Sequence, residues 1–286
     1  MKVAIDAGAL LGEGPRWDAA AGRLLWVDIE GRALHLFDPG LDEDRAIQLD
    51  NRVGSAAPTA DGGVLVALAD RLAVVELETE SVRTLVEIPH GDELRLNDGA
   101  CDPAGRFWFG SVALDFAPGA AALYRYSGEG GLDRMLEGVT ISNGLGWSRD
   151  GGTMYYVDSM AYRVDAFDFD LATGAISDRR PLIVIERGGG IPDGLAVDDE
   201  GGIWLALWGK ASIRRYSPNG ELDRVLDVPA DNVTACCFGG ADGRSLYVTS
   251  ASVDLSEEKR RARPLAGSVF VTELDVSGPP ARPFAG

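Results

Sequence analysis

Histidine and cysteine are scarce in this chain. Of 286 residues, two are histidine and three are cysteine. His35 and His90 alone leave little material for a Ser-His-Asp hydrolase or for a zinc site built from imidazoles. Cys101, Cys236 and Cys237 form no C-x-x-C pair and no disulfide framework, so we interpret them as small core residues. A metal ion in this protein would therefore be held mainly by oxygen atoms.

Basic residues and long apolar runs are also lacking. The chain has 27 Lys and Arg against 45 Asp and Glu, which gives a formal net charge of −18 at pH 7. Such an excess of acid disfavours nucleic acid and anionic membrane surfaces as partners. Neither an 18-residue apolar run nor a signal-peptide core after Met1 is found. We therefore expect a cytoplasmic protein with no membrane partner.

Turns rich in aspartate and glycine recur along the whole chain. Each follows a short apolar segment and precedes a run of β-branched and aromatic residues, the pattern of a β-hairpin. Their spacing varies around about 44 residues, within the range typical of propeller blades. The six turns are Asp18–Gly22, Asp61–Gly63, Asp102–Gly105, Asp150–Gly152, Asp198–Gly202 and Asp242–Gly243.

Further short strands follow each hairpin, so that four strands occur in each of six repeats. This pattern predicts an all-β fold, a six-bladed β-propeller with four antiparallel strands per blade and a central channel. No linker or break in composition interrupts residues 1–286, so we expect one domain, as a monomer or a weak homodimer. Leu255–Arg261 is the one helix candidate. Val3–Ile5 is expected to complete the last blade beside Val269–Leu274.

Four polar residues occupy one equivalent place in these repeats. Glu13, Asn97, Asn143 and Asp193 each stand eight or nine residues before a turn glycine, at the start of a predicted innermost strand. Because these strands surround the axis, the four side chains should converge at one mouth of the channel. The loops after the second strands return to the same face and should bring to its rim Asp28, Asp70, Asp115, Asp158, Trp208 and Ser250. A plainer interpretation is that Asn-Gly, Asp-Gly and Glu-Gly only make turns.

Two carboxylates and two amides that converge in a narrow channel need compensation, because an unpaired buried charge costs several kcal/mol. A divalent cation would supply it. All-oxygen ligation suits calcium, magnesium or manganese, and zinc is also compatible with carboxylates and water. The predicted cofactor is therefore one divalent cation, with calcium, zinc, manganese, magnesium and iron(II) as candidates.

Several segments carry a family resemblance. Leu11–Trp17, Arg95–Gly99, Ile141–Leu145 and Ile191–Leu195 closely resemble blocks of the senescence-marker-protein/gluconolactonase/luciferin-regenerating family, which includes regucalcin. In that family the fold is a six-bladed propeller, and the typical activity is sugar lactone hydrolysis with one divalent metal.

The resemblance also implies roles for individual residues. It implies that Glu13, Asn143 and Asp193 bind the metal and that Asp193 is also the general base. Arg95 matches the arginine that grips the substrate, and Asn97 is expected beside the metal, in contact with the ligand. Asp115 stands where some members have an acidic substrate contact, although its flanking loop differs.

The leading hypothesis is a metal-dependent lactonase that opens a small sugar lactone, such as a gluconolactone, xylonolactone or arabinolactone, to the aldonic acid. Hydrolysis of organophosphate esters on a similar propeller is a second enzymatic possibility. The alternative from another class is a calcium-binding regulatory protein like regucalcin. Arg95 and Asn97 favour an enzyme, because a calcium store needs neither a substrate clamp nor an open ligand position.

Overall fold

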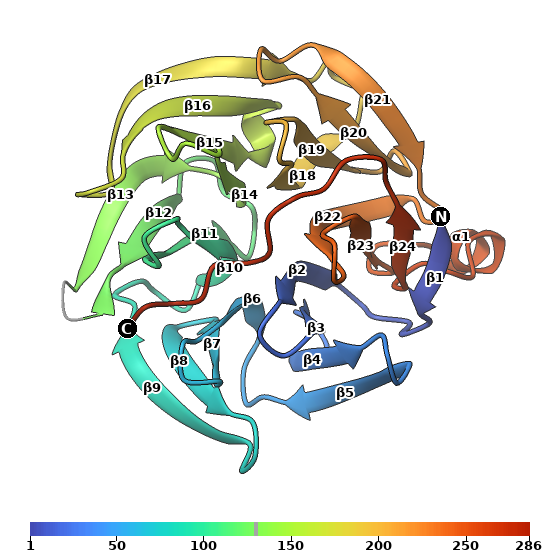
Figure 1. The fold of residues 1–286 in the computed structure, drawn as a ribbon, viewed down its shortest axis with the longest axis horizontal. Helices are drawn as coiled ribbons and strands as arrows, with labels where there is room; N and C mark the ends of the chain where they lie inside the picture. The colour runs from blue at the N-terminus through green and yellow to red at the C-terminus, as the bar shows by residue number, and fades with distance from the viewer. Residues whose placement is uncertain (129–130) are drawn as a thin grey trace.

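The chain forms a ring of antiparallel β-sheets around a central axis (Figure 1). The computed structural model describes residues 1–128 and 131–286. Strand pairing within these residues defines four sheets of four strands and a fifth sheet of eight. The predicted all-β propeller is confirmed, whereas the pairing gives five hydrogen-bonded sheets where six separate ones were expected.

The four smaller sheets follow one another along the chain, and each is a meander of consecutive strands. The first two comprise β2 (Gly12–Asp18), β3 (Arg23–Asp28), β4 (Ala33–Asp38) and β5 (Glu43–Gln48), then β6 (Val53–Pro58), β7 (Val64–Leu68), β8 (Arg71–Glu76) and β9 (Ser81–Glu87). The next two comprise β10 (Leu94–Cys101), β11 (Phe107–Ala113), β12 (Ala121–Tyr126) and β13 (Leu132–Val139), then β14 (Ser142–Trp147), β15 (Thr153–Asp158), β16 (Arg163–Asp170) and β17 (Ala175–Val184).

The eight-stranded sheet contains two such meanders. One comprises β18 (Ile191–Val197), β19 (Ile203–Trp208), β20 (Ser212–Tyr216) and β21 (Leu222–Asp227); the other comprises β22 (Asn232–Gly239), β23 (Ser245–Ala251), β24 (Val269–Glu273) and β1 (Lys2–Ile5). A single residue pair, Trp208 with Asn232, joins the two halves.

The ring closes by pairing the two ends of the chain. Val3 pairs with Phe270 and Ile5 with Val269, so the predicted completion of the last sheet by Val3–Ile5 is confirmed. The expected short helix is present as α1 (Glu257–Ala262), and a single 3-10 turn, η2, spans Ser159–Ala161. Neither of these described helices has the length and apolar character needed to cross a membrane.

The core lies between neighbouring sheets. Leu25 and Val27 of β3 pack in one apolar cluster with Val64 and Val66 of β7 in the next sheet. Alternation along each strand sends successive side chains to opposite faces, so a strand in the ring contributes apolar residues to both of its neighbours. This explains why the inner strands are rich in apolar residues on both faces.

The aspartate of the hairpin turn has a repeated structural role. Asp198 Oδ1 accepts hydrogen bonds from the Glu200 and Gly202 backbone N–H groups at 3.0 and 2.7 Å, while Oδ2 accepts one from Trp204 Nε1 at 2.8 Å. Asp102 likewise binds the turn backbone and Trp108 Nε1, at 2.9 Å. One carboxylate therefore closes the turn and satisfies a buried indole, which explains part of the repeat seen in the sequence.

The C-terminal residues cross one end of the channel, as the red segment in Figure 1 shows. Ala281 N–H donates to the Trp17 carbonyl at 3.1 Å and Phe284 N–H to that of Pro58 at 2.8 Å. The Phe284 ring is buried and stacks on Tyr126, with centroids 5.7 Å apart. This tail therefore ties several sheets together across the ring.

Phe284→Ala is expected to lower the free energy of unfolding by about 3 kcal/mol, because it removes a buried ring that the fold cannot easily replace. Arg282→Ala, at an exposed position in the same tail, is the matched control and should change it by less than about 0.5 kcal/mol. Urea unfolding of both variants measures the difference. Equal stability of the two variants would show that the tail does not hold the ring together.

Candidate metal and substrate site

A cavity of about 610 Å³ opens at the end of the channel where the innermost strands begin. Glu13 of β2, Asn97 of β10, Asn143 of β14 and Asp193 of β18 all line it. Each of the four is buried, with 5 to 6% of its surface exposed. The structure therefore brings together the four polar residues that the repeat pattern placed at one mouth.

The position of these four residues within their strands explains why they face the axis. Each strand pairing slips at this point: between Glu13 and Arg16, Leu96 and Gly99, Ser142 and Leu145, and Pro192 and Leu195. Such β-bulges re-aim side chains and locally increase twist. The Asn-Gly and Asp-Gly pairs therefore lie in bulged strands and do not form hairpin turns.

The glycine after the polar residue is required by close packing between sheets. A Cβ on Gly144 would lie 2.7 Å from the Asp193 carbonyl oxygen, closer than real Cβ contacts allow. The glycine therefore lets β14 approach β18 and brings Asn143 near Asp193. This packing role accounts for the recurrent dipeptide that the sequence alone leaves open to interpretation as a turn.

Two of the expected rim residues support the site from behind. Asp28 Oδ2 and Oδ1 accept hydrogen bonds from the Leu10 and Leu11 backbone N–H groups, each at 2.9 Å. Asp158 does the same for Thr140 and Ile141, each at 3.1 Å. These buried carboxylates do not line the cavity. They hold the segments that lead into β2 and β14 and so position Glu13 and Asn143.

A chain of hydrogen bonds orients the amides. Arg95 Nη1 donates to Asn97 Oδ1 at 2.6 Å, and Asn97 Nδ2 donates to Asn143 Oδ1 at 2.9 Å. Asn143 Nδ2 in turn donates to Ser159 Oγ at 2.8 Å. Asn143 therefore turns its oxygen, the atom able to ligate a cation, toward Asn97 and away from Ser159.

The carboxyl groups have little compensation. Asp193 Oδ1 is buried and has no hydrogen-bond partner among the described residues. Within the described part of the chain, Glu13 Oε2 accepts a hydrogen bond only from its neighbour Gly14 N–H, at 3.1 Å. Burial, and then the nearby Asp98, raise the pKa of Glu13 from 4.5 to about 8. Burial, followed by the charges of Glu13 and Asp98, holds the pKa of Asp193 well above its usual value.

This donor set fits a divalent cation. Two carboxyls and an amide oxygen are hard ligands suited to calcium, magnesium or manganese, and a positive ion would remove the cost of burying the two like charges. No group of three or more His, Cys, Asp or Glu side chains in residues 1–128 and 131–286 is arranged to hold a metal. The candidate set therefore depends on the amide oxygen of Asn143.

Arg95 lies in the same cavity, and Trp208 also lines it. Burial lowers the pKa of Arg95 to about 10, so its guanidinium is still charged at neutral pH. Asp115 is exposed and does not line the cavity, whereas its neighbours Leu114 and Phe116 do. Asp115 Oδ1 accepts from the Ala117 N–H at 3.0 Å, and its contact with substrate stays a prediction.

Sequence reasoning missed several charged neighbours. Asp98 is buried beside Asn97 and pairs with Arg16, whose Nη2 lies 3.1 Å from Asp98 Oδ1. Glu30 and Arg52 line the cavity and form an ion pair with each other at 3.0 Å. Arg16 and Asp98 lie inside the segments that resemble the family, so this resemblance could have identified them. Glu30 and Arg52 lie outside every motif, so no signal was available for them.

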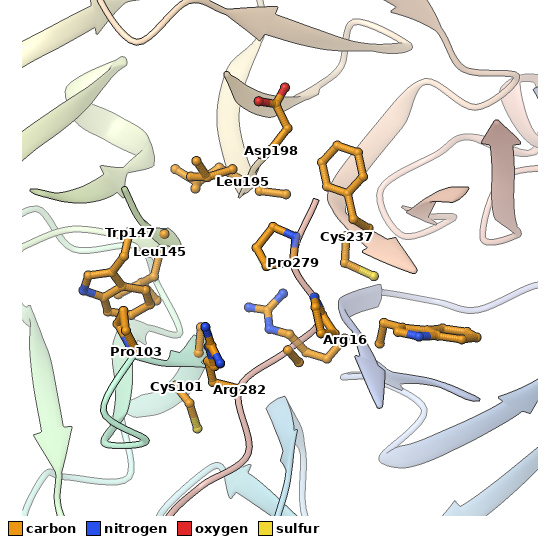
Figure 2. A pocket seen from close by; sticks show the side chains of 18 of the residues that line it. Arg16, Cys101, Pro103, Leu145, Trp147, Leu195, Asp198, Cys237, Pro279 and Arg282 are labelled. Atoms are coloured by element: carbon orange, nitrogen blue, oxygen red, sulfur yellow. The ribbon is translucent and has the colours of Figure 1, made fainter. Parts of the chain in front are cut away.

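A second cavity, of about 410 Å³, lies at the opposite end of the channel, where the innermost strands finish (Figure 2). Pro279 and Arg282 of the C-terminal tail lie over it, with Arg16 and Cys237 beside them. Asp198 borders this cavity but is engaged by its own turn and by Arg215 Nε at 2.7 Å. None of the four converging polar residues lies at this end.

The ring of sheets and the oxygen-rich pocket at one mouth define a β-propeller with a candidate cation site. Residues 11–252 match the family described as "SMP-30/Gluconolactonase/LRE-like region". The chain belongs to this family, as the motif resemblance indicated.

Known relatives are similar over nearly the whole chain. Regucalcin of Gallus gallus is 38% identical over 284 residues, covering 96% of this chain and 95% of its own length. The Bacillus subtilis (strain 168) protein named "Putative sugar lactone lactonase YvrE" is 35% identical over 283 residues, covering 98% and 97%. A crystal structure of a calcium-binding protein, regucalcin from Agrobacterium tumefaciens, superimposes with a TM-score of 0.96 at 29% identity, covering 99% of this chain and 96% of the other.

The buried carboxyls make a prediction for metal-free protein. The folded state holds the Glu13 proton up to about pH 8, whereas the unfolded chain loses it near pH 4.5. Between these values the folded state binds more protons, so this group's contribution to stability falls as pH rises. Glu13→Gln removes the effect, and its stability relative to wild type should therefore increase from pH 5 to pH 8.5.

Urea midpoints of chelator-treated wild type and Glu13→Gln, taken at several pH values, measure this difference. Added calcium should restore wild-type stability at high pH and leave Glu13→Gln largely unchanged. A stability difference that does not vary with pH would contradict the buried, uncompensated state of Glu13.

Proposed function

We propose that this protein is a metal-dependent sugar lactone hydrolase that opens aldonolactones to aldonic acids. The observation that carries the proposal is the pair of buried, poorly compensated carboxyls, Glu13 and Asp193, in one cavity with Asn143, Asn97 and Arg95. Membership of a family that includes gluconolactonases supports the lactonase assignment. The name of the Bacillus subtilis relative supports a sugar lactone as the substrate class.

We also propose that the chain is a single domain, a β-propeller with six blades. The eight-stranded sheet consists of two four-stranded meanders joined by the single pair Trp208 and Asn232, so each meander is taken as one blade. On this count every blade begins with an innermost bulged strand. Ser55 and Thr234, both buried on the two remaining innermost strands, then complete the ring of positions.

Glu13, Asn143 and Asp193 are the proposed metal ligands. A divalent cation bound by them would supply positive charge next to the lactone carbonyl oxygen, where negative charge develops during hydrolysis. The charge would also favour the ionised forms of Glu13 and Asp193, whose pKa values are raised without it. Calcium, zinc, manganese, magnesium and iron(II) stay as candidates.

Asp193 is the proposed general base. Its unpartnered, buried Oδ1 is available to accept a proton from an attacking water molecule. The same carboxyl can return this proton to the ring oxygen that leaves, which keeps the proton balance of hydrolysis. Arg95 and Asn97 would orient the substrate hydroxyls, because each is already held in place by the hydrogen bond between them at 2.6 Å.

A calcium-binding regulatory protein is the second candidate function, favoured by the regucalcin relatives and by the calcium-binding protein of Agrobacterium tumefaciens. Both functions would use the same ligands. They differ in whether the cavity beside the ligands, with Arg95 on its wall, accepts and turns over a lactone.

The direct test reconstitutes metal-free protein with each candidate cation and assays several aldonolactones. Hydrolysis is expected only in the presence of metal. Asn143→Ala should lose both bound metal and activity, whereas the exposed Asn219→Ala should keep both. Stoichiometric metal binding by the wild type without turnover of any lactone would favour the regulatory alternative.

Asp193→Asn separates the base from the ligand role. The amide keeps an oxygen for the metal but cannot accept a proton, so the rate should fall roughly 10²- to 10⁴-fold. Turnover is measured at full metal occupancy, which elemental analysis checks independently. A fully loaded variant with turnover close to wild type would exclude Asp193 as the base.

A further inference from the structure

An ion pair that the family-like segments do not include lies in the wall of the 610 Å³ cavity. Arg52, just before β6, donates from Nε to Glu30 Oε2 at 3.0 Å. Both side chains are partly exposed, at 36% and 28%, so the pair faces the cavity and is not buried in the core. Through Nε the guanidinium is held in a defined orientation.

Arg52 is close enough to Arg95 for their charges to interact. The Arg52 charge acts to lower the pKa of Arg95, and the Glu30 charge acts to raise it. The wall therefore carries two guanidinium groups and one carboxylate. Glu30 already offsets Arg52 through their ion pair, and a further anion between the two guanidinium groups would reduce their mutual repulsion.

Both guanidinium groups have donors to spare. Among the described residues, Arg52 Nη1 and Nη2 have no hydrogen-bond partner, and Arg95 uses only Nη1, toward Leu96 O and Asn97 Oδ1. A carboxylate matches the planar fork of a guanidinium and can accept two of its N–H groups at once.

Besides Glu30, the acids that line this cavity are Glu13, Asp193 and Asp254, and the charges of Glu13 and Asp193 also act on Arg95. Asp254 follows β23 in the sheet half that contains β22, and Val253 beside it donates to Leu10 O at 2.9 Å. β2 packs between β22 and β6, so Asp254 and Arg52 lie on opposite sides of it. Glu13 and Asp193 are the proposed metal ligands, so a bound cation would take up their charge and leave the donors of Arg52 and Arg95 that have no partner among the described residues for another anion.

We propose that Arg52 is a specificity-determining residue and that, together with Arg95, it binds a carboxylate carried by the substrate away from the lactone group. The inference rests on the proposed lactonase function and narrows its substrate class to lactones of sugar dicarboxylic acids. The lactone end lies at Glu13, Asn143 and Asp193, and the free carboxylate lies against the arginine wall. No covalent step is added to the reaction.

The test compares two 1,5-lactones that differ only at C6, where one carries CH₂OH and the other a carboxylate. The measured quantity is the ratio of kcat/KM for the anionic lactone to that for the neutral one. In metal-loaded wild type this ratio should exceed one. In Arg52→Gln it should fall about 10- to 100-fold, the usual effect of losing a charged hydrogen bond.

Glu30→Gln is a second variant with the opposite expected sign. It removes the carboxylate that offsets Arg52, so the ratio should rise above the wild-type value. Added salt should reduce the ratio in wild type, because it screens partly exposed charges. Arg45→Gln, which breaks the exposed Arg45–Glu80 pair away from the cavity, is the matched control and should leave the ratio unchanged.

The inference is overturned if wild type prefers the neutral lactone, or if Arg52→Gln and Glu30→Gln shift the ratio in the same direction. Failure of the proposed function is separate: metal-loaded wild type would then hydrolyse neither lactone. In that case the affinities for the open-chain dicarboxylate and monocarboxylate, measured by calorimetry, still test the proposed carboxylate site. Tighter dicarboxylate binding that is lost in Arg52→Gln supports the carboxylate site, and equal affinities overturn it.

Discussion

The burial of two carboxyl groups close together, without a matching cation from the protein, is the constraint on which the candidate site depends. Glu13 and Asp193 come from strands far apart in the chain, and both are 6% exposed. Arg95 offsets part of their charge, but Asp98 adds to it. Such an arrangement costs stability in the metal-free protein, and a cation bound at the proposed site would remove most of that cost. The uncompensated carboxyl groups at this mouth therefore favour the binding of a metal ion through oxygen ligands.

The rest of the scaffold keeps these groups in place against their repulsion. Bulges turn the side chains toward the axis, and Gly144 permits β14 and β18 to approach. Asp28 and Asp158 hold the segments that precede Glu13 and Asn143. β1 closes the ring by pairing with β24, and the C-terminal tail donates hydrogen bonds to Trp17 and Pro58 in two different sheets.

The two ends of the channel have different chemistry although the same strands form both. At the end where the innermost strands begin, the cavity is lined by carboxyl groups, amides, Arg52 and Arg95. At the other end, the tail covers a cavity whose buried arginine, Arg16, is already paired with Asp98. The proposed lactone site therefore lies at one end of the channel only.

The sequence by itself determined the repeat, the all-β propeller and the equivalence of Glu13, Asn97, Asn143 and Asp193, because turn chemistry and strand periodicity are local. It also determined the pairing of Val3–Ile5 with the last sheet, since apolar strands at the two chain ends have few other partners. Tertiary structure alone decided that the dipeptides with glycine lie in bulges, since a close approach to the next sheet involves residues about fifty positions away. Tertiary structure also decided that Trp208 pairs with Asn232 and so joins two meanders into one sheet. It alone brought Arg52 and Glu30 into the cavity, because the sequence around a charged loop residue does not show which surface that residue faces.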